Sequence, residues 1–377
     1  MRLSRLRLEN WRNFRNVDLG IGGRAFLVGP NASGKSNLLD ALRFLRDIAV
    51  VGGGFQAAVT RRGGVKRIRC LAARQRSDVE AEVSIESFSG EAWTYGVRFN
   101  QDSQKRPLLK AEWVDRAKER VLSRPSPDDK RDPERLTQTA LEQVNVNREF
   151  RVVAEFLASV NYLHIVPQLV REPDRSVGVR NDPYGGDFLE QVASKPEGTQ
   201  RARLRRIADA LKVAVPQLGE LELWRDARGT PHLRGRHEHW RPIGAWQTED
   251  QFSDGTLRLL GLLWAVLEGR GPLLLEEPEL SLHPGVVRFL PQMFARMQSR
   301  TGRQILVSTH SADLLADEGI GLDEVFLLQP GKEGTAVRSA AKVRRIRALL
   351  DGGVSLPEVV LPETRPHEAQ QLRLFGN

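Results

Sequence analysis

The sequence predicts an α/β fold, in which a mixed core sheet is joined to an antiparallel β subdomain and a largely helical insertion. Short apolar runs at residues 25–28, 273–275 and 305–308 are typical of strands that are buried on both faces. A further run at 325–329 predicts another strand of the core. Three longer segments with apolar residues at helical spacing supply the α component: 36–50, 255–268 and 285–299.

Alternating patterns predict the antiparallel subdomain. Residues 2–9 alternate between apolar and polar side chains, which is typical of a strand with one solvated face. Two further alternating runs, 79–85 and 93–99, follow each other closely enough to form an antiparallel hairpin.

Changes of character along the chain divide it into three segments. Residues 1–100 form the expected N-terminal lobe. From residue 101 the pattern becomes helical, over 134–159 and 199–213, and we expect 101–240 to be an inserted, mostly helical lid. Residues 241–377 form the expected C-terminal lobe.

The charge balance favours a polyanionic partner. The formal net charge is +9, which points to nucleic acid above other partners. Arginines are spread along most of the chain, so an incidental basic surplus stays open as the alternative. Three groups are candidates for phosphate contacts: Arg61, Arg62, Lys66, Arg67 and Arg69; Arg201, Arg203, Arg205 and Arg206; Lys342, Arg344, Arg345 and Arg347.

The sequence carries no expected membrane or export signal. No apolar run approaches the roughly 20 residues needed to cross a bilayer. The arginine-rich N-terminus does not resemble a signal peptide. The single cysteine, Cys70, excludes an internal disulfide framework. We therefore expect a cytoplasmic protein without membrane contact.

The segment GPNASGKS, from Gly29 to Ser36, has the spacing of a phosphate-binding loop. It follows a predicted strand and opens a predicted helix, which is the context that such a loop needs. Backbone N–H groups and the helix N-terminus can cradle phosphates, while Lys35 reaches the terminal phosphates and Ser36 binds Mg²⁺. The candidate nucleotide-binding residues are Gly29, Pro30, Asn31, Ala32, Ser33, Gly34, Lys35, Ser36 and Asn37.

The segment LLLEEPE, residues 273–279, places two carboxylates at the end of a buried strand. Ligands of open α/β sheets gather at that end of the strands. Adjacent strand residues point to opposite sides, so Glu276 and Glu277 are expected to do different work. One is expected to support Mg²⁺ and the other to activate water as a general base.

Two further polar turns complete the pattern. His310 ends the predicted strand at 305–308, beside the acidic strand, and could contact a γ-phosphate or the attacking water. Ser253, Asp254 and Gly255 open the apolar helix at 255–268 and offer a second phosphate-binding helix start. A single triphosphate has little use for two such starts, unless the second one serves the site of another molecule.

These elements, in this order, resemble the nucleotide-binding heads of ABC-type ATPases. The closest likeness is to the SMC/RecF-like branch, together with OLD (overcoming lysogenization defect) family proteins and stand-alone defence ATPases. The matching segments are LENWRNFRNVDL, the Walker A segment GPNASGKSNLLDAL, the signature FSDGTLRLLGLL, the Walker B and D-loop segment LLLEEPELSLHP, and the switch-histidine segment STHSADLL.

The resemblance implies roles for single residues. Glu276 takes the metal-supporting place and Glu277 the place of the catalytic base, while Lys35 and His310 complete the catalytic set. Ser253 and Gly255 would bind the γ-phosphate of a partner's ATP. Two residues depart from the common pattern: Glu276 replaces the commoner Asp, and Asp254 replaces a glycine and would call for a neutralising neighbour. Gln56 is the candidate for the metal-contacting Q-loop glutamine, by its position alone.

The function implied is a slow ATPase that uses ATP and Mg²⁺ and pairs head to head with a second copy. We expect it to act as a switch on nucleic acid, or through a separate effector protein such as a nuclease, in prokaryotic anti-phage defence. A RecF-like repair or recombination ATPase, and a regulatory ATPase that binds only protein partners, are the alternatives.

Overall fold

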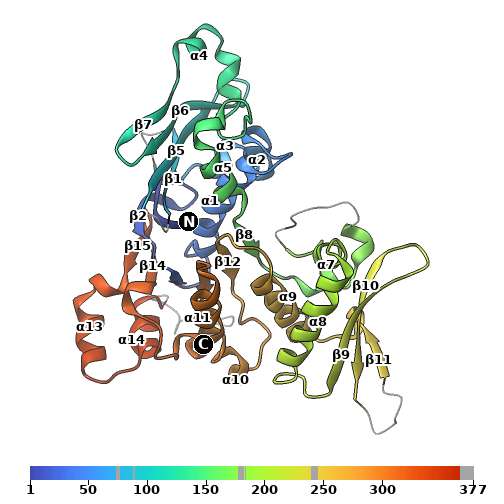
Figure 1. The fold of residues 1–377 in the computed structure, drawn as a ribbon. Helices are drawn as coiled ribbons and strands as arrows, with labels where there is room; N and C mark the ends of the chain where they lie inside the picture. Colours follow the sequence, from blue (N-terminus) through green and yellow to red (C-terminus); the bar gives the residue numbers. More distant parts are fainter. Residues whose placement is uncertain (74–76, 88–89, 177–181, 183, 239–244, 366–377) are drawn as a thin grey trace, which may run out of the picture.

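The computed structural model describes residues 1–73, 77–87, 90–176, 182, 184–238 and 245–365, arranged around three sheets (Figure 1). The helices are α1 (Lys35–Ala49), α2 (Phe55–Arg61), α3 (Val65–Ile68), α4 (Pro127–Arg131), α5 (Arg151–Ala158), α6 (Pro167–Val170), α7 (Phe188–Ala193), α8 (Glu197–Leu211), α9 (Asp254–Leu267), α10 (Pro284–Val287), α11 (Leu290–Thr301), α12 (Ala312–Leu315), α13 (Arg344–Asp351) and α14 (Leu356–Glu363). None of these helices is long and apolar enough to cross a membrane.

The core sheet is mixed and carries the phosphate-binding loop near its centre. Its order is β15-β14-β3-β13-β12-β8, and all neighbours are parallel except the pair β14 and β15. The strands are β3 (Arg24–Val28), β8 (Asn161–Leu163), β12 (Leu273–Glu276), β13 (Ile305–Thr309), β14 (Val325–Gly331) and β15 (Gly334–Ser339). The predicted strands at 25–28, 273–275, 305–308 and 325–329 therefore lie side by side, and the mixed α/β fold is confirmed.

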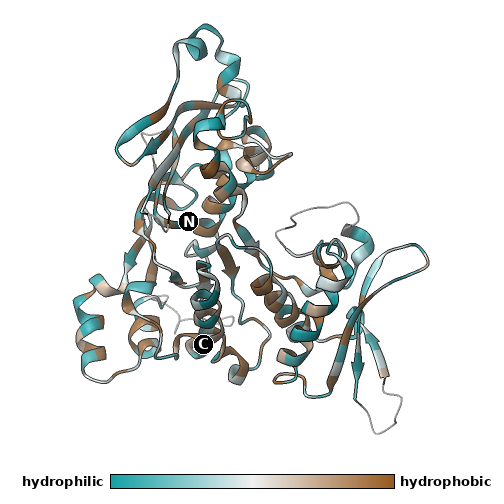
Figure 2. Ribbon diagram, in the orientation of Figure 1, coloured by the Kyte–Doolittle hydropathy of each residue, from teal (hydrophilic) through white to brown (hydrophobic). Residues whose placement is uncertain are grey.

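The central core strands β3, β13 and β12 are buried on both faces. Leu274 and Leu306 belong to one hydrophobic core, whereas their neighbours Leu275 and Val307 belong to the other. Adjacent strand residues point to opposite faces, so each strand contributes to both cores. Helix α1 packs in the first core, and α9 and α11 pack in the second. Figure 2 shows α9 as apolar along most of its length, as burial requires.

The antiparallel sheet extends further than the sequence predicted. Its order is β2-β1-β4-β5-β6-β7, with strands β1 (Arg2–Trp11), β2 (Phe14–Gly20), β4 (Val79–Glu86), β5 (Ala92–Gln101), β6 (Pro107–Arg116) and β7 (Glu119–Arg124). The expected boundary at residue 101 thus falls within the sheet, because β6 and β7 continue it. The predicted segment 101–240 is also not one inserted unit, since β8 joins the core sheet.

A third, smaller sheet lies beside α7 and α8 (Figure 1). Its order is β11-β10-β9, with β9 (Leu218–Arg225), β10 (Pro231–His237) and β11 (Ala245–Thr248), all antiparallel. Leu204 and Leu211 of α8 share a core with Leu221 and Leu233 of the sheet.

Two predicted helices are interrupted. The segment 285–299 forms α10 and α11 with a break between them, because Pro291 stands at the start of α11 and has no N–H to continue a helix. Within the segment 134–159, an α-helix begins only at Arg151. Before it, Glu142 accepts the backbone N–H groups of Phe55 and Thr139, and Asn147 donates to Leu141 O. Such side-chain bonds compete with a regular helix.

Candidate nucleotide and metal site

The phosphate-binding loop joins β3 to α1 and has a strained backbone. Ala32 and Gly34 have φ values of 61° and 96°. A Cβ atom on Gly34 would lie 2.2 Å from the side-chain nitrogen of Asn13. Both the left-handed conformation and the close approach therefore require glycine at this position. The loop leads directly into α1, whose first residue is Lys35.

Asn13 braces this loop from the N-terminal strand pair. Its side-chain amide donates to Ser33 O at 2.8 Å and to the Thr335 hydroxyl at 2.7 Å. The Asn37 amide donates to the Asn13 carbonyl oxygen at 2.8 Å. Asn13 lies in the segment LENWRNFRNVDL, which carried the family likeness, but nothing in the sequence singled out this side chain.

Lys35 is buried and bends back over the loop. Its ammonium donates to Gly29 O at 3.0 Å and to Pro30 O at 3.3 Å, and lies 3.6 Å from Glu277 Oε1. These partners leave the ammonium at the end of the loop, where the terminal phosphates of a bound triphosphate would meet it.

Glu276 ends β12 and bridges two elements. One carboxylate oxygen accepts the hydroxyl of Ser36 on α1, and the other accepts the hydroxyl of Tyr162 on β8. Burial and the Glu276 carboxylate raise the pKa of Tyr162, so its hydroxyl stays a proton donor. Arg43 lies over the same ring, 5.0 Å from its centroid. No sequence pattern pointed to Tyr162, because only the sheet pairing brings β8 next to β12.

Glu277 lies just after the end of β12, and its carboxylate has other partners than that of Glu276. Its φ of 43° is unusual for a residue with a side chain, and its N–H donates to Ser308 O at 3.0 Å. Its carboxylate lies 3.1 Å from His310 Nδ1 as well as 3.6 Å from the Lys35 ammonium. Such backbone strain clusters at active sites. The structure thus brings Glu277, Lys35 and His310 together, although they are far apart in the sequence.

Glu279 fixes the turn that carries His310 through contacts with Thr309 and with the His310 backbone. It is buried, its carboxylate accepts the Thr309 hydroxyl at 2.5 Å, and it lies 3.4 Å from the His310 backbone nitrogen. Burial raises the pKa of Glu279. No sequence pattern predicted a role for Glu279, because this residue lies in the turn after the acidic pair and not at the end of the strand.

The signature turn forms the start of α9. Ser253 caps the helix, with its hydroxyl oxygen accepting the Thr256 N–H at 3.2 Å. Asp254 pairs with Arg171 at 2.6 Å, so the neutralising neighbour that this acid required is present. A Cβ on Gly255 would lie 2.4 Å from Ser281 O, which explains the glycine. In the part of the chain that the structure describes, this turn makes no hydrogen bond to the phosphate-binding loop.

Gln56 does not lie with these residues, which corrects its assignment as a metal ligand. Its side-chain amide donates to Pro107 O at 2.9 Å and to Thr137 O at 2.8 Å. Both amide protons are thereby used to fasten α2 to the antiparallel sheet and the turn that follows it. A position after the first helix was the only basis for the assignment, and position alone does not orient a side chain.

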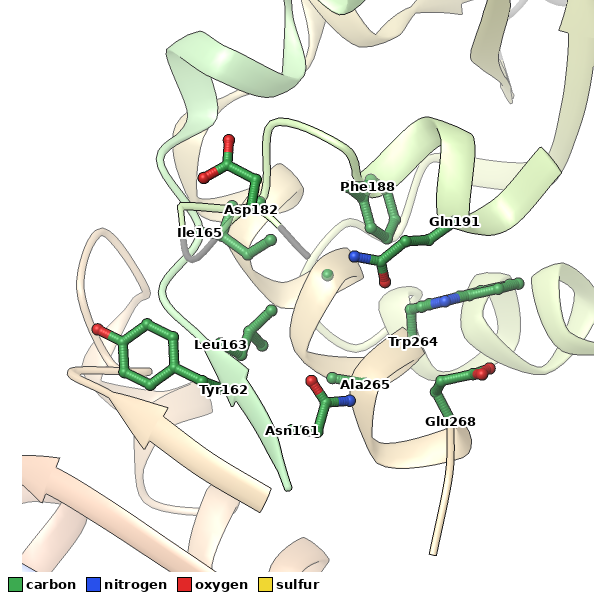
Figure 3. A pocket seen from close by; sticks show the side chains of 12 residues that line it. Asn161, Tyr162, Leu163, Ile165, Asp182, Phe188, Gln191, Trp264, Ala265 and Glu268 are labelled. Carbon is green, nitrogen blue, oxygen red and sulfur yellow. The ribbon is translucent and has the colours of Figure 1, made fainter. Parts of the chain in front are cut away.

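The oxygen donors fit Mg²⁺ bound together with a triphosphate. Ser36 and Glu276 present a hydroxyl and a carboxylate side by side, and Mg²⁺ prefers few protein oxygens plus phosphates and water. Among the described residues no group of three or more His, Cys, Asp or Glu side chains could hold a metal alone. The nearby cavity between β8 and α9 has a volume of only about 20 Å³, which is room for one water molecule (Figure 3).

The phosphate-binding loop, the acidic pair and His310 lie at the carboxyl ends of β3, β12 and β13. Comparison with protein families agrees with this geometry: the family described as "AAA domain, putative AbiEii toxin, Type IV TA system" matches residues 24–317. The chain belongs to this family. The matched range contains the phosphate-binding loop, the signature turn, the acidic pair and His310.

Curated relatives match over short stretches. A "DNA replication and repair protein RecF" from Pasteurella multocida is 46% identical over 63 residues, which is 16% of this chain and 16% of the relative. Another RecF, from Rhizobium etli, is 35% identical over 97 residues, covering 24% of this chain and 25% of the relative. The chain therefore spans a quarter or less of these relatives.

Solved structures show the same fold over nearly the whole chain. An SMC head bound to the C-terminal winged-helix domain of ScpA has a TM-score of 0.53 and 14% identity, covering 90% of this chain and 97% of that chain. The SMC head with an extended coiled coil from Pyrococcus furiosus has a TM-score of 0.52 and 13% identity, covering 93% and 99%. The chain of this AAA-domain family thus has the fold of these SMC heads.

Proposed function

We propose that this chain binds ATP with Mg²⁺ and hydrolyses it slowly. The observation that carries the proposal is the position of Glu277, whose carboxylate lies 3.6 Å from the Lys35 ammonium and 3.1 Å from His310 Nδ1. A carboxylate between a phosphate-binding lysine and a histidine is placed to take a proton from water that attacks the γ-phosphate.

The other residues of the site take complementary roles. Lys35 exchanges its carbonyl and carboxylate partners for the β- and γ-phosphates when ATP enters. Ser36 and Glu276 would hold Mg²⁺, which neutralises the phosphate charge when it is bound. His310 donates a hydrogen bond to the γ-phosphate or orients the water. Tyr162 keeps the Glu276 carboxylate turned toward Ser36.

Two copies are proposed to pair head to head around two ATP molecules. The N-terminus of α9, with Ser253 and Gly255, is a phosphate-binding helix start that makes no hydrogen bond to its own loop within the described residues. A twofold dimer would bring it to the partner's γ-phosphate. The ion pair of Asp254 with Arg171 removes the charge that would otherwise repel that phosphate.

Mixing two inactive variants tests this arrangement. Lys35→Ala removes the loop lysine, and Ser253→Arg blocks the signature turn, so each homodimer has two broken sites. A mixed dimer keeps one site in which both halves are intact. We expect the mixture to regain ATP hydrolysis up to a fraction of the wild-type rate, and a mixture as inactive as its parts would contradict head-to-head pairing.

We further propose that the ATP-driven dimer acts in the cytoplasm on nucleic acid, or through an effector that does, in anti-phage defence. The family description supports this through its reference to a toxin–antitoxin system. Many cations of the predicted groups are exposed: Arg61, Lys66, Arg67, Arg69, Arg205, Arg206, Lys342, Arg344, Arg345 and Arg347. Two others serve the fold instead, since Arg62 pairs with Asp40 and Asp47, and Arg203 pairs with Glu268 over the ring of Trp264.

Binding of DNA and RNA at several salt concentrations, with and without ATP, tests the nucleic-acid partner. Phosphate contacts give an affinity that falls steeply with salt, with a log–log slope of roughly −0.9 per contact on duplex DNA. Reversing the charges of Arg61, Lys66, Arg67 and Arg69 should flatten that slope. Equal binding by this variant and the wild type would favour the alternative in which the chain regulates protein partners only.

A RecF-like role in DNA repair is the second candidate, because the curated matches are RecF proteins. Binding to a junction between single- and double-stranded DNA in preference to uniform duplex would favour repair. Two results together would favour defence. The protein would bind DNA without such a preference and without cleaving it, and cells that carry the Glu277→Gln variant would lose phage resistance.

A further inference from the structure

A groove runs between helix α8 and strand β9, and none of its lining residues belongs to the nucleotide site. Its volume is about 420 Å³. Strand β9 contributes five consecutive residues, and α8 contributes residues spaced three or four apart along one face. The lining is Glu197, Gln200, Arg201, Leu204, Arg205, Ala208, Asp209, Gly219, Glu220, Leu221, Glu222 and Leu223.

Strand β9 presents its edge to this groove. It is the last strand of the order β11-β10-β9, so only β10 pairs with it in the described part of the chain. Consecutive residues of a strand point to opposite faces, so five in a row can line one groove only along the strand's edge. Within the described residues, the backbone of 219–223 has no hydrogen-bond partner on that side. Such an edge is a template for another strand.

The groove has the length of a short extended peptide. Five residues of β9 span about 16 Å at roughly 3.3 Å per residue. The face of α8 from Glu197 to Asp209 spans about 18 Å at 1.5 Å per residue. The two walls therefore run alongside each other over a distance that an extended segment of five to seven residues fills (Figure 1).

The side chains specify what such a segment would carry. Leu204, Ala208 and Leu221 are buried and make an apolar floor on the α8 side. On the opposite face of the strand, Glu220 and Glu222 each pair with an arginine of β10. Among the described residues, no strand lies next to them on the groove side. Opposite charges on adjacent strands stabilise pairing, so basic residues suit that position.

We propose that this groove binds an extended segment of a separate protein, which adds to β9 as a further strand. Apolar and basic residues alternate along this segment. The apolar side chains pack on the floor between α8 and β9, and the basic side chains pair with Glu220 and Glu222. Main-chain hydrogen bonds supply affinity and the alternating side chains supply selectivity, as in other strand-addition complexes. The groove is separate from the nucleotide site, so binding requires no ATP.

The test uses the whole chain and a fluorescein-labelled peptide, Lys-Leu-Lys-Val-Lys-Leu-Lys-amide. Fluorescence anisotropy without ATP should show a dissociation constant on the order of 10 µM. The same peptide with N-methyl groups on alternate backbone nitrogens cannot pair along one edge and should not bind. Amide hydrogen exchange should slow at residues 219–223 when the unmodified peptide is present. Lys35→Ala protein should bind equally, which separates this proposal from the ATPase.

Charge variants locate the binding. Glu220→Lys with Glu222→Lys should weaken the peptide roughly tenfold, because two cross-strand pairs become repulsive. Glu119→Lys with Glu149→Lys changes the net charge equally at exposed sites that do not line the groove and should have no effect. No binding at ~1 mM, equal binding of the N-methylated peptide, or exchange protection elsewhere would overturn the proposal. Protection of 219–223 by oligothymidylate but not by the peptide would assign the groove to nucleic acid instead.

Discussion

The core sheet and the six-stranded antiparallel sheet differ in how their charged side chains are satisfied. In the antiparallel sheet the charges pair across neighbouring strands, as Arg98 does with Glu80 at 2.6 Å. Its buried Arg124 lies 3.0 Å from Glu112 and 2.9 Å from Asp129. In the core sheet the charges of the candidate site collect at the carboxyl ends of the strands, where Glu277 lies 3.6 Å from the Lys35 ammonium. At the amino end of β3, Arg24 and Glu324 form a structural pair at 2.8 Å.

This difference separates structural charges from functional ones. Strands that run antiparallel place complementary residues opposite each other, so their charges neutralise one another within the fold. Parallel strands end together, so their terminal polar groups converge on a place where a ligand can enter. Removing a charge should therefore cost stability in the first sheet and chemistry in the second.

The largest expected effect is on stability, from Arg124→Met. Arg124 is buried between Glu112 and Asp129, and burial raises the pKa of Glu112. Losing Arg124 leaves the buried Glu112 without its cation and leaves Asp129 with only the half-exposed Arg135, which should cost about 3–5 kcal/mol. Urea unfolding measures this, while ATP hydrolysis per folded molecule should stay near the wild-type rate. Arg98→Met, at an exposed pair, is the matched control and should cost less than about 1 kcal/mol.

Glu277→Gln should have the largest effect on chemistry. Losing the base should lower the ATP hydrolysis rate roughly 10²-fold or more, because positioned acid–base groups contribute that much. ATP binding should persist, since the loop and Lys35 supply most of the triphosphate contacts. A steady-state assay of phosphate release, with binding measured separately, makes the comparison. Hydrolysis at the wild-type rate would show that another group is the base.

Tyr162→Phe should have a smaller effect, confined to the metal. The hydroxyl that holds Glu276 is lost, while the ring under Arg43 is retained. One hydrogen bond to a charged group is worth about 1.5 kcal/mol, so the Mg²⁺ concentration that half-saturates ATP binding should rise roughly tenfold. Tyr184→Phe, at a half-exposed tyrosine, is the control. A change in melting temperature without a change in Mg²⁺ dependence would mean that Tyr162 serves only the fold.

The smallest expected effect belongs to the exposed pair of Arg5 and Asp18. Their side chains are 51% and 41% exposed, so a double-mutant cycle with alanine should give about 0.2–1 kcal/mol. The hydrogen bond from Arg5 lowers the pKa of Asp18 in the folded protein. Because the pKa of Asp18 is lower in the folded protein than its unfolded value near 4, the ionised carboxylate stabilises the fold at pH values above about 4. This contribution is lost as the pH falls through the folded pKa. A coupling that is unchanged between pH 7 and pH 2 would contradict this assignment.

The sequence by itself determined the order and chemistry of the core elements. The loop from Gly29 to Ser36 needs glycine spacing between a strand and a helix, and that spacing is local. The acidic pair Glu276 and Glu277 follows directly on the three leucines of a buried strand, and that adjacency is also local. For this reason the structure brings Lys35, Glu277 and His310 together as the sequence analysis expected.

Only the tertiary structure decided which distant segments meet these residues. Asn13, Tyr162 and Arg171 belong to separate segments, and sheet pairing or helix packing places them against the loop, Glu276 and Asp254. Charge is subject to the same dependence on tertiary structure. The sequence predicted that Arg62 and Arg203 are available for phosphate contacts, but they form ion pairs with Asp40 and Glu268. Periodicity reports which face of an element is buried, whereas long-range pairing decides what that face is buried against.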